Sequence, residues 1–565
     1  MAVSGEQTPR CIWIALWKSS ENKMRHYQLS VQCLKSFEVR CVRLSMLALD
    51  QALDHFTSWT YLTKIFRHVK RFSPSRWLFF DFFAHGHVKD IRLTCRRFRD
   101  ASSHLLVHFL RVGMTRDSLA HFQEISRHPT IRKGVQAVRV YLNFFSPLMA
   151  NNILKFAQYH IDKLRETTGH IDAGVTQGMY DKPEDEANAK EAVRKMSEIL
   201  DSWEDFVWDR PDITTSGYAK LLQRAEEEES GHLKVLLKAH EGYRERFSYQ
   251  QRSIKSGAFI ASIGAAMARM PLATRLEIHD QEPLTQRFKP TFYQKVEDRE
   301  CLITSMMRPA EWEEARLFNL GDPPAKVLLK LPGTIHKAGG IVISLAIKFS
   351  PPENYSCLAL SKDGQRDLKE ALRRLKDFDF HPEAVKGLRV GPIRDEAEIQ
   401  HLSKFLNTIM DTDCLESIDL CFETLWERRT TPHFTLGPVI MLRPWPNLNH
   451  VSWYAPSLHL EDIKQFVSDL SKKPSYMSMW DCHLLSGTWA EALDILRGNT
   501  QYITFKDPFG AECDDMTDEQ KKAIFEAEGK HHMDTSPAEN YLRGYIPNNP
   551  LRNNAPEPAE AMEED

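Results

Sequence analysis

A six-residue pattern of apolar positions recurs along the chain from about residue 130 onward. Apolar side chains occupy its first, fourth and sixth positions. The copies are Val135, Val138 and Val140; Ala273, Leu276 and Ile278; Val385, Leu388 and Val390; Leu415, Ile418 and Leu420; Leu448, Val451 and Trp453; and, more weakly, Pro474, Met477 and Met479. The fourth and sixth positions point to one face of a β-strand. Because a lone strand cannot bury that face, the pattern predicts strands that stack side by side.

The segments between the copies predict amphipathic helices. Residues 398–410, 461–470 and 489–496 carry apolar side chains at helical spacing. The central residues of the last four copies recur at intervals of roughly 30 residues, which suits one strand and one helix. The alternation predicts an α/β fold, built as an irregular solenoid over residues 129–510.

Two longer gaps indicate insertions in this repeat. The intervals between the first three copies are several times longer than those between the last four. The first gap predicts helices within 187–203 and 218–246. The second contains a strand-like run at 340–349 and a helical pattern at 365–375.

Residues 71–128 predict a compact helical module that precedes the repeat. Ser73-Pro74 favours a helix start, since proline suits the first helical turn. A second helix is predicted at 88–98, with Arg92, Arg96 and Arg99 on its polar side. A third helix is expected to begin near Asp100 and to include Phe109, and a fourth spans 117–126. Residues 1–70 have no clear pattern beyond some helical pieces and stay unassigned.

The C-terminal segment differs in composition from the rest. Residues 511–565 contain 14 acidic and 5 basic side chains. Thr517 and Gln520 have the spacing of a capping box, which predicts one short helix. The richness in proline, asparagine and glutamate after about residue 535 predicts an acidic tail that is largely disordered.

Composition and charge narrow the function classes. No apolar run is long enough for a membrane span or a secretory signal, so we expect a cytoplasmic or nuclear protein. The ten cysteines include no C-x-x-C pair, which argues against a zinc or dithiol site. Residues 1–150 hold 23 Lys and Arg against 10 Asp and Glu, so the excess of acid lies in the remainder. This asymmetry can steer charged partners.

Four stretches carry a family resemblance. "KDIRLTCRRFRDASSHLL" (89–106) resembles the second half of an F-box as found in fungal F-box proteins. "DSLAHFQEISRHPTIRKGVQAVRV" (117–140) is similar to the junction that precedes their leucine-rich-repeat-like region. "PWPNLNHVSW" (444–453) and "HLLSGTWAEALDIL" (483–496) look like late repeats of that region. The opening Leu-Pro-x-Glu element of an F-box is absent here, and Ser73-Pro74-Ser75-Arg76 stands in its place.

The resemblance implies a substrate receptor of an SCF-type E3 ubiquitin ligase. The F-box-like module would dock on the SCF adaptor protein and, through it, on the cullin. The repeat domain would bind a target protein. Position by position, the resemblance assigns adaptor binding to Pro74, Leu78, Phe82, Ile91, Leu93 and Phe98. Buried aromatic anchors of this kind dominate many interfaces.

Three alternatives remain open. A repeat scaffold without ligase connection would share the repeat domain and lack only the docking function. Nucleic-acid binding would use the arginines of 92–99 as phosphate contacts. An enzyme is disfavoured, because the sequence contains no phosphate-loop, dinucleotide, nucleophile-elbow or H-E-x-x-H motif. His104 and His108 alone make an incomplete metal site. We therefore expect no catalytic residue, no cofactor and no metal.

Overall fold

The structure is a computed structural model, and the description covers part of the chain. The described residues are 103–180, 182–208, 222–223, 225–228, 231–281, 296, 298–352, 354–382, 396–422, 435, 437–440, 444–527 and 535–553. The chain divides into two compact units, Met1–Leu106 and Val107–Asp565. Nearly all described residues belong to the second unit. The predictions for residues 1–102, including the helices at 71–98, lie outside the described residues.

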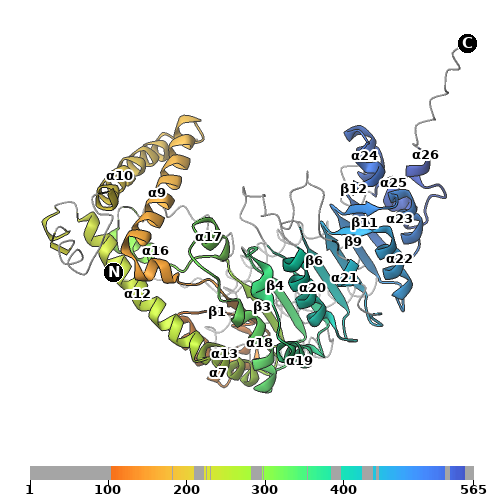
Figure 1. Cartoon of the computed structure of the whole chain (residues 1–565), viewed down its shortest axis with the longest axis horizontal. Coiled ribbons are helices and arrows are strands. Elements are labelled where there is room, and N and C mark those ends of the chain that lie inside the picture. Colours follow the sequence, from red (N-terminus) through yellow and green to blue (C-terminus); the bar gives the residue numbers. More distant parts are fainter. Residues whose placement is uncertain are drawn as a thin grey trace, which may run out of the picture. The chain divides into compact units, whose positions relative to one another are not determined.

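The second unit is a mixed α/β structure built on one parallel sheet (Figure 1). Its nine strands are β1 (Phe109–Gly113), β2 (Ala137–Tyr141), β3 (Arg275–His279), β4 (Ser344–Lys348), β5 (Asp377–Phe380), β6 (Ser417–Cys421), β7 (His450–Tyr454), β9 (Tyr476–Trp480) and β11 (Tyr502–Lys506). They lie in the sheet in their order along the chain, and every neighbouring pair is parallel. The predicted α/β class is confirmed.

The apolar triplets form the buried face of this sheet. Five of the six predicted copies lie on β2, β3, β6, β7 and β9. The register aligns the central positions in one buried row: Leu110, Val138, Leu276, Leu345, Phe378, Ile418, Val451, Met477 and Ile503. A second buried row aligns Val112, Val140, Ile278, Ile347, Phe380, Leu420, Trp453, Met479 and Phe505.

The strand next to β6 on its β5 side comes from a different segment than the predicted triplet. Val385, Leu388 and Val390 lie outside the described residues, and β5 occupies that place in the sheet. β5 carries the same pattern in Leu375, Phe378 and Phe380, all of which are buried. The strand-like run at 340–349 is confirmed by β4. The sequence analysis did not predict β1, β5 and β11.

A layer of helices covers the buried face. Its members are α7 (Arg116–Arg127), α13 (Ala258–Arg269), α18 (Ala325–Lys337), α19 (Lys362–Leu372), α20 (Glu396–Met410), α21 (Gly437–Ile440), α22 (Leu460–Asp469) and α23 (Trp489–Leu496). Each packs against the next in this order, parallel to the order of the strands (Figure 1). The rings of Trp453 and Phe466 lie 4.7 Å apart, so β7 contacts α22 directly. The helices predicted at 117–126, 365–375, 398–410, 461–470 and 489–496 are confirmed.

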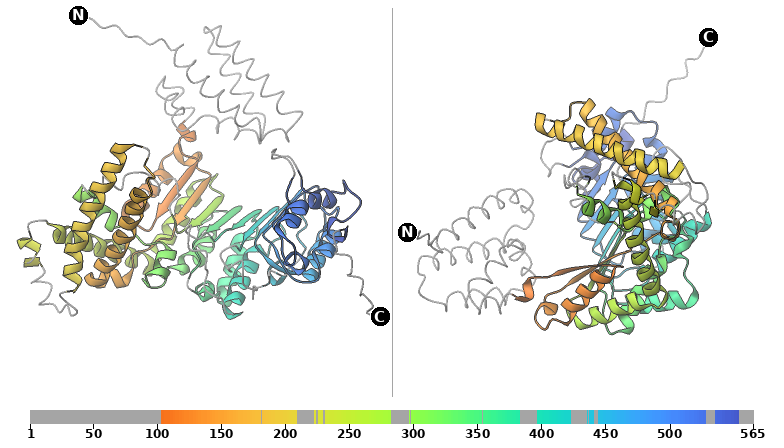
Figure 2. Two further views of the ribbon diagram at one scale, coloured as in Figure 1. Left: turned by 90° about the horizontal axis from the view of Figure 1, so that it is seen from above. Right: turned by 90° about the vertical axis from the view of Figure 1, so that its left-hand side faces the viewer.

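The long gaps hold inserted helices (Figure 2). Between β2 and β3 lie α8 (Pro147–Asn151), α9 (Ile153–Thr176), α10 (Pro183–Trp208) and α12 (His232–Lys255). Between β3 and β4 lie α16 (Arg299–Met306) and α17 (Trp312–Leu317). Two buried hydrogen bonds tie α12 to the segment after β2. Ser146 N donates to Tyr243 Oη at 2.7 Å, and Phe145 N donates to Gln250 Oε1 at 2.9 Å.

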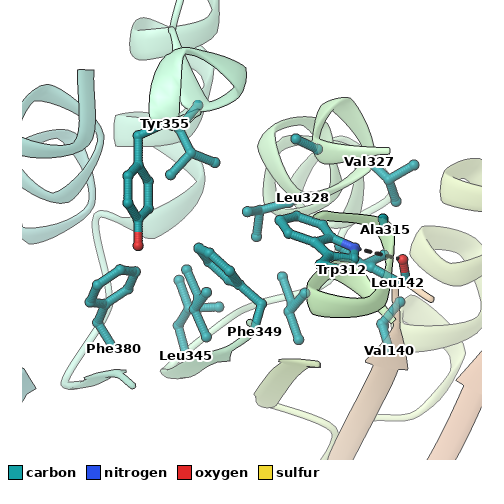
Figure 3. Close-up of a cluster of buried hydrophobic side chains, with 14 of the residues drawn as sticks. Val140, Leu142, Trp312, Ala315, Val327, Leu328, Leu345, Phe349, Tyr355 and Phe380 are labelled. Atoms are coloured by element: carbon teal, nitrogen blue, oxygen red, sulfur yellow. Dashed lines mark hydrogen bonds between the residues drawn. The ribbon is translucent and has the colours of Figure 1, made fainter. Parts of the chain in front are cut away.

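α17 is anchored over the centre of the core (Figure 3). The indole of Trp312 donates to the carbonyl of Leu142 at 2.9 Å and lies 5.0 Å from the ring of Phe349. The backbone N–H groups of Trp312 and Ser350 both donate to the carboxylate of Asp280. Burial raises the pKa of Asp280 to about 6, against the lowering effect of these hydrogen bonds. Asp280 thus joins β3 to α17 and to the chain after β4.

The last three sheet strands repeat at a constant interval. Val451, Met477 and Ile503 are paired neighbours, and equivalent positions of successive strands lie 26 residues apart. After these strands Ala455, Asp481 and Asp507 have φ angles of 54°, 54° and 48°. These left-handed corners lead into β8 (Ser457–His459), β10 (His483–Ser486) and β12 (Phe509–Gly510), which form a second parallel sheet.

Two predicted boundaries are wrong. Phe109 does not belong to a third helix of an N-terminal module. Phe109–Gly113 forms β1, whose Leu110 and Val112 are buried in the sheet core. The repeat-bearing unit therefore begins near residue 107 instead of residue 129.

Short 3₁₀ helices of the described residues are η1 (Ser103–Leu105), η2 (Ile131–Lys133), η3 (Tyr355–Leu358) and η5 (Ala511–Cys513).

The prediction of a largely disordered tail is also wrong for residues 535–553. The C-terminal segment contains α24 (Asp518–Phe525), α25 (Pro537–Leu542) and α26 (Pro550–Asn553). The capping box of Thr517 and Gln520 is confirmed at the start of α24. The composition of residues 535–553 predicted disorder because most of them are polar, but a few apolar side chains are enough to anchor the segment. Those buried in the core are Ala538, Tyr541, Leu542 and Leu551.

α25 covers the outer edge of β11. Glu539 Oε1 accepts from Phe505 N at 3.1 Å, and Arg543 Nη2 donates to the carbonyl of Ile503 at 3.0 Å. Asp494 of α23 binds the same segment, since it accepts from Tyr541 Oη at 2.5 Å and from Asn549 Nδ2 at 2.7 Å. The side chains of the C-terminal segment thus satisfy backbone groups that a further strand would otherwise bind.

Candidate functional site

The residues that alternate with the buried rows point to the other side of the sheet. We call this side the open face. It consists of the first, third and fifth residues of each of the nine strands, or the first and third in β5. Their positions are fixed by a sheet of parallel strands with two buried rows beneath them. A surface of this kind holds its side chains in a fixed array.

The register gives the open face a central row of aligned side chains. From β1 to β11 the row consists of Arg111, Arg139, Glu277, Ala346, Asp379, Asp419, Ser452, Ser478 and Thr504. Its chemistry changes along the sheet from arginines through carboxylates to small hydroxyls. Neighbouring parallel strands lie about 4.8 Å apart, so each residue in the row is within reach of the next.

The first part of the row is a compact ion-pair network. Glu277 Oε2 accepts from Arg139 Nε at 2.8 Å, and Glu277 Oε1 accepts from Arg275 Nε at 2.8 Å. His279 Nε2 lies 3.7 Å from Glu277 Oε2. Burial by itself raises the pKa of Glu277, but His279, Arg139 and Arg275 together outweigh it and lower that pKa to about 2. Glu277 and the two arginines satisfy one another's charges, which favours a structural role for this network.

The middle of the row is acidic. Asp379 and Asp419 are paired neighbours on β5 and β6. Lys348 Nζ lies 2.9 Å from Asp379 Oδ2, whereas Asp379 Oδ1 has no hydrogen-bond partner in the part of the chain that the structure describes. Burial, and after it the charge of Asp379, raise the pKa of Asp419 above its ordinary value. Asp377 adds a third carboxylate on the first position of β5, and burial and then Glu416 raise its pKa as well.

The last three strands carry large side chains on both sides of the central row, aromatic at every position except Lys506. At the first strand positions, the rings of His450 and Tyr476 stack at 4.7 Å and 10°, and Tyr502 follows in register. At the fifth positions, Tyr454 and Trp480 lie 6.2 Å apart, and Lys506 Nζ lies 4.9 Å above the Trp480 ring. Trp480 is 36% exposed and Tyr502 is 56% exposed, which is unusual for such large side chains.

Between the two rows lie only small hydroxyl side chains. Ser452, Ser478 and Thr504 are the central residues of β7, β9 and β11. Ser478 is buried, while Ser452 and Thr504 are half-buried, and Tyr476 Oη lies 3.5 Å from Thr504 Oγ1. The hydroxyls therefore form a row of small side chains between two rows of larger ones, and the row continues to Asp419 and Asp379. We call this strip of β7, β9 and β11 the trough.

This arrangement offers several kinds of group for binding. Aromatic rings, carboxylates and hydroxyls on a rigid sheet can bind apolar, cationic and hydrogen-bonding groups respectively. Among the described residues, no group of three or more His, Cys, Asp or Glu side chains is placed to hold a metal ion. In the same part of the chain, no helix is both long enough and apolar enough to cross a membrane.

The structure does not test the residues that the sequence analysis assigned to adaptor binding. Pro74, Leu78, Phe82, Ile91, Leu93 and Phe98 all lie outside the described residues. The open face was missed, although the triplet pattern contained its signal. Counted from the first apolar residue of each triplet, the third, fifth and seventh positions are those that form the open face.

No protein-family model matches the chain, and no curated protein matches it.

Proposed function

We propose that this chain is a protein-recognition subunit, the substrate receptor of an SCF-type E3 ubiquitin ligase. In this proposal residues 71–106 form an F-box-like module that docks on the adaptor and thereby on a cullin. The second unit is a leucine-rich-repeat-like solenoid that binds a target protein through its open face. The chain itself performs no catalysis, and the ligase enzymes that the complex recruits act on the bound target.

The observation that carries the proposal is the aromatic and acidic open face. Its exposed Trp480 and Tyr502 stand on a nine-stranded sheet in sequence order, with one helical layer on the other side. Tryptophan and tyrosine are enriched among the residues that dominate protein interfaces. A rigid array of such side chains loses little conformational entropy when it binds a partner. Stacked strand–helix units are also the architecture that repeat proteins use for extended binding surfaces.

The ligase half of the proposal depends on the N-terminal module. The resemblance at 89–106 and the apolar side chains at Leu78, Phe82 and Leu93 support it. An apolar helical surface that docks on an adaptor should contain a few residues that each contribute about 2 kcal/mol or more. Removal of one of them should weaken adaptor binding more than tenfold, because about 1.4 kcal/mol corresponds to a factor of ten.

Co-purification of the full-length chain from its native cells tests the proposal. We expect the wild type to enrich adaptor and cullin, and Leu93→Asp and Phe82→Ala each to lose both. Tyr502→Ala, on the open face, serves as the matched control and should retain adaptor and cullin. Thermal unfolding of each variant establishes that it is folded.

Two outcomes would contradict the proposal. Folded Leu93→Asp and Phe82→Ala variants that retain all partners of the wild type would exclude the assigned docking surface. A wild type that enriches neither adaptor nor cullin would leave a repeat scaffold without ligase connection as the function.

A further inference from the structure

We propose, on the basis of the proposed function, that the open face from β5 to β11 binds an extended basic segment of a target protein. The segment crosses the strands along the central row and places an arginine side chain between Asp379 and Asp419. Its remaining residues lie in the trough between the two rows of larger side chains.

The first argument is charge. Three carboxylates, those of Asp377, Asp379 and Asp419, lie on two neighbouring strands, and Lys348 is the cation paired with Asp379. Asp379 Oδ1 has no hydrogen-bond donor in the described part of the chain. That oxygen is buried, so an incoming cation would act on the charge of the two carboxylates, and it would reduce the repulsion between the half-buried Asp379 and Asp419.

Arginine suits this place better than lysine. Its planar guanidinium presents several N–H donors, so it can bridge carboxylates on two strands about 4.8 Å apart. Lysine offers a single point of charge and can favour only one of the two carboxylates.

The second argument is the width of the trough, which favours an extended chain. Tyr476 and Trp480 are the first and fifth residues of β9. Their Cα atoms are therefore about 13 Å apart, at about 3.3 Å per residue. The rings occupy part of that distance, and an α-helix with its side chains is about 10–12 Å wide. An extended segment fits between the rows and a helix does not.

The third argument is the match between the row of hydroxyls and an extended backbone. The hydroxyls of Ser452, Ser478 and Thr504 can each donate and accept hydrogen bonds. From β5 to β11 the central row covers four strand intervals, about 19 Å. An extended chain of about six residues covers this length. The occupant is thus a segment of about six residues with arginine at the β5–β6 end and an apolar or aromatic side chain near Tyr502 and Trp480.

Binding of the purified full-length chain to immobilised short peptides tests this inference. One set contains a single arginine, followed after a short serine and glycine spacer by leucine, so that the two side chains span the trough. The second set has glutamate and the third has lysine in place of arginine. We expect binding in the order arginine, lysine, glutamate, with little binding of the glutamate set and a decrease as salt rises.

Four variants locate the binding. Asp379→Asn and Asp419→Asn should each weaken binding of the arginine peptides about tenfold. Tyr502→Ala should weaken the binding of all leucine-containing peptides. Asp363→Asn is the matched control, since it makes the same change of charge at an exposed position of α19. It should bind as the wild type does.

Peptide binding and adaptor co-purification together distinguish failure of this inference from failure of the proposed function. Equal binding of the glutamate and arginine sets, or unchanged binding by both folded asparagine variants, would overturn the basic-segment inference. Adaptor co-purification with the same Asp379→Asn and Asp419→Asn proteins should stay at the wild-type level. If peptides bind as expected and no adaptor is enriched, the ligase role fails and the peptide site remains.

Discussion

At two glycines near the C-terminal end, the backbone conformation or the packing leaves little room for a larger residue. Gly487 follows β10 with a φ of 82°, and a Cβ there would lie 2.6 Å from Leu460 Cβ. Gly498 has a φ of 69°, but a Cβ at that position would have nothing within 4 Å. Both positions require the left-handed region, whereas only Gly487 also requires the absence of a side chain.

We therefore predict different costs for alanine at the two positions. Gly498→Ala should lower the free energy of unfolding by about 1 kcal/mol, which is the cost of the left-handed backbone. Gly487→Ala should lower it by about 3 kcal/mol, because the packing of Leu460 must also shift. Urea denaturation monitored by tryptophan fluorescence measures both. Equal losses would show that the contact with Leu460 does not matter.

Glu277 gives a prediction on acid stability. Its pKa in the folded chain is about 2, below the ordinary 4.5 of a glutamate. Its contribution to stability is therefore fully present above about pH 4.5 and is lost as the pH falls from there towards 2. We expect the loss to reach up to about 3 kcal/mol.

Urea midpoints between pH 2.5 and 5 measure this contribution. Glu277→Gln should be less stable than the wild type at pH 5 and should depend less on pH in this range. Glu461→Gln, on the exposed first turn of α22, is the control and should retain the wild-type slope. A wild-type slope in Glu277→Gln would exclude the ion-pair network as its cause.

At the scale of elements, helix α25 and the residue that follows it cover the edge of the last strand of the sheet. The carboxylate of Glu539 accepts a hydrogen bond from the amide of Phe505, and Arg543 donates one to the carbonyl of Ile503. Those are the backbone groups that a parallel neighbour would bind, so these two side chains replace a strand. An uncovered edge strand is a common starting point of aggregation.

Glu539→Ala should uncover the edge of β11. The buried Phe505 amide would lose its acceptor, which costs about 1–3 kcal/mol. We expect hydrogen exchange at Phe505 to become at least tenfold faster, with little change in β6 and β7. Glu526→Ala, at the exposed end of α24, is the control and should leave the exchange of β11 unchanged. Equal exchange in both variants would contradict a capping role for α25.

The elements also show what the sequence could predict. Five triplets predicted strands correctly because their fourth and sixth positions are apolar and lie on one face, while the residues beside them lie on the other. β5 was missed because the letters "DFDF" place carboxylates beside both buried phenylalanines, and β11 because Thr500 takes the first position of its triplet. β1 was assigned to a helix because Leu105, Leu106 and Phe109 also have helical spacing.

The residues of the open face could have been predicted, but which of them become neighbours could not. Those residues were visible beside the apolar positions of each triplet, but their neighbours depend on the register between strands. Arg139 and Glu277 are 138 residues apart in the chain and become paired only in the sheet. Local patterns contain no information on such a pairing.

At the scale of the whole molecule, the proposed function assigns separate tasks to the two faces of the sheet. Trp453 of β7 lies in the buried face at 1% exposure, whereas Trp480 of β9 lies on the open face. The two tryptophans stand on adjacent strands of one sheet. Stability should therefore depend on the first and partner binding on the second.

The matched pair of substitutions tests this division. Trp453→Ala should lower the free energy of unfolding by about 3–5 kcal/mol, as expected for a large cavity in a core. Trp480→Ala should change stability by less than about 1 kcal/mol, as at most surface positions, and should weaken binding of the leucine-containing peptides. Thermal unfolding and peptide binding measure the two effects. A large stability loss in Trp480→Ala would contradict the separation of the two faces.

The constant interval between β7, β9 and β11 has a consequence for how such a chain can change length. Since strand and left-handed corner recur at the same interval, a cut at one corner and a join at the next would remove one whole unit and preserve the phase of those that remain. Genetic gain or loss of one such unit in this region would thus lengthen or shorten the trough in single steps. Under the proposed function, descendants would then match targets of different length while their folded framework stayed intact.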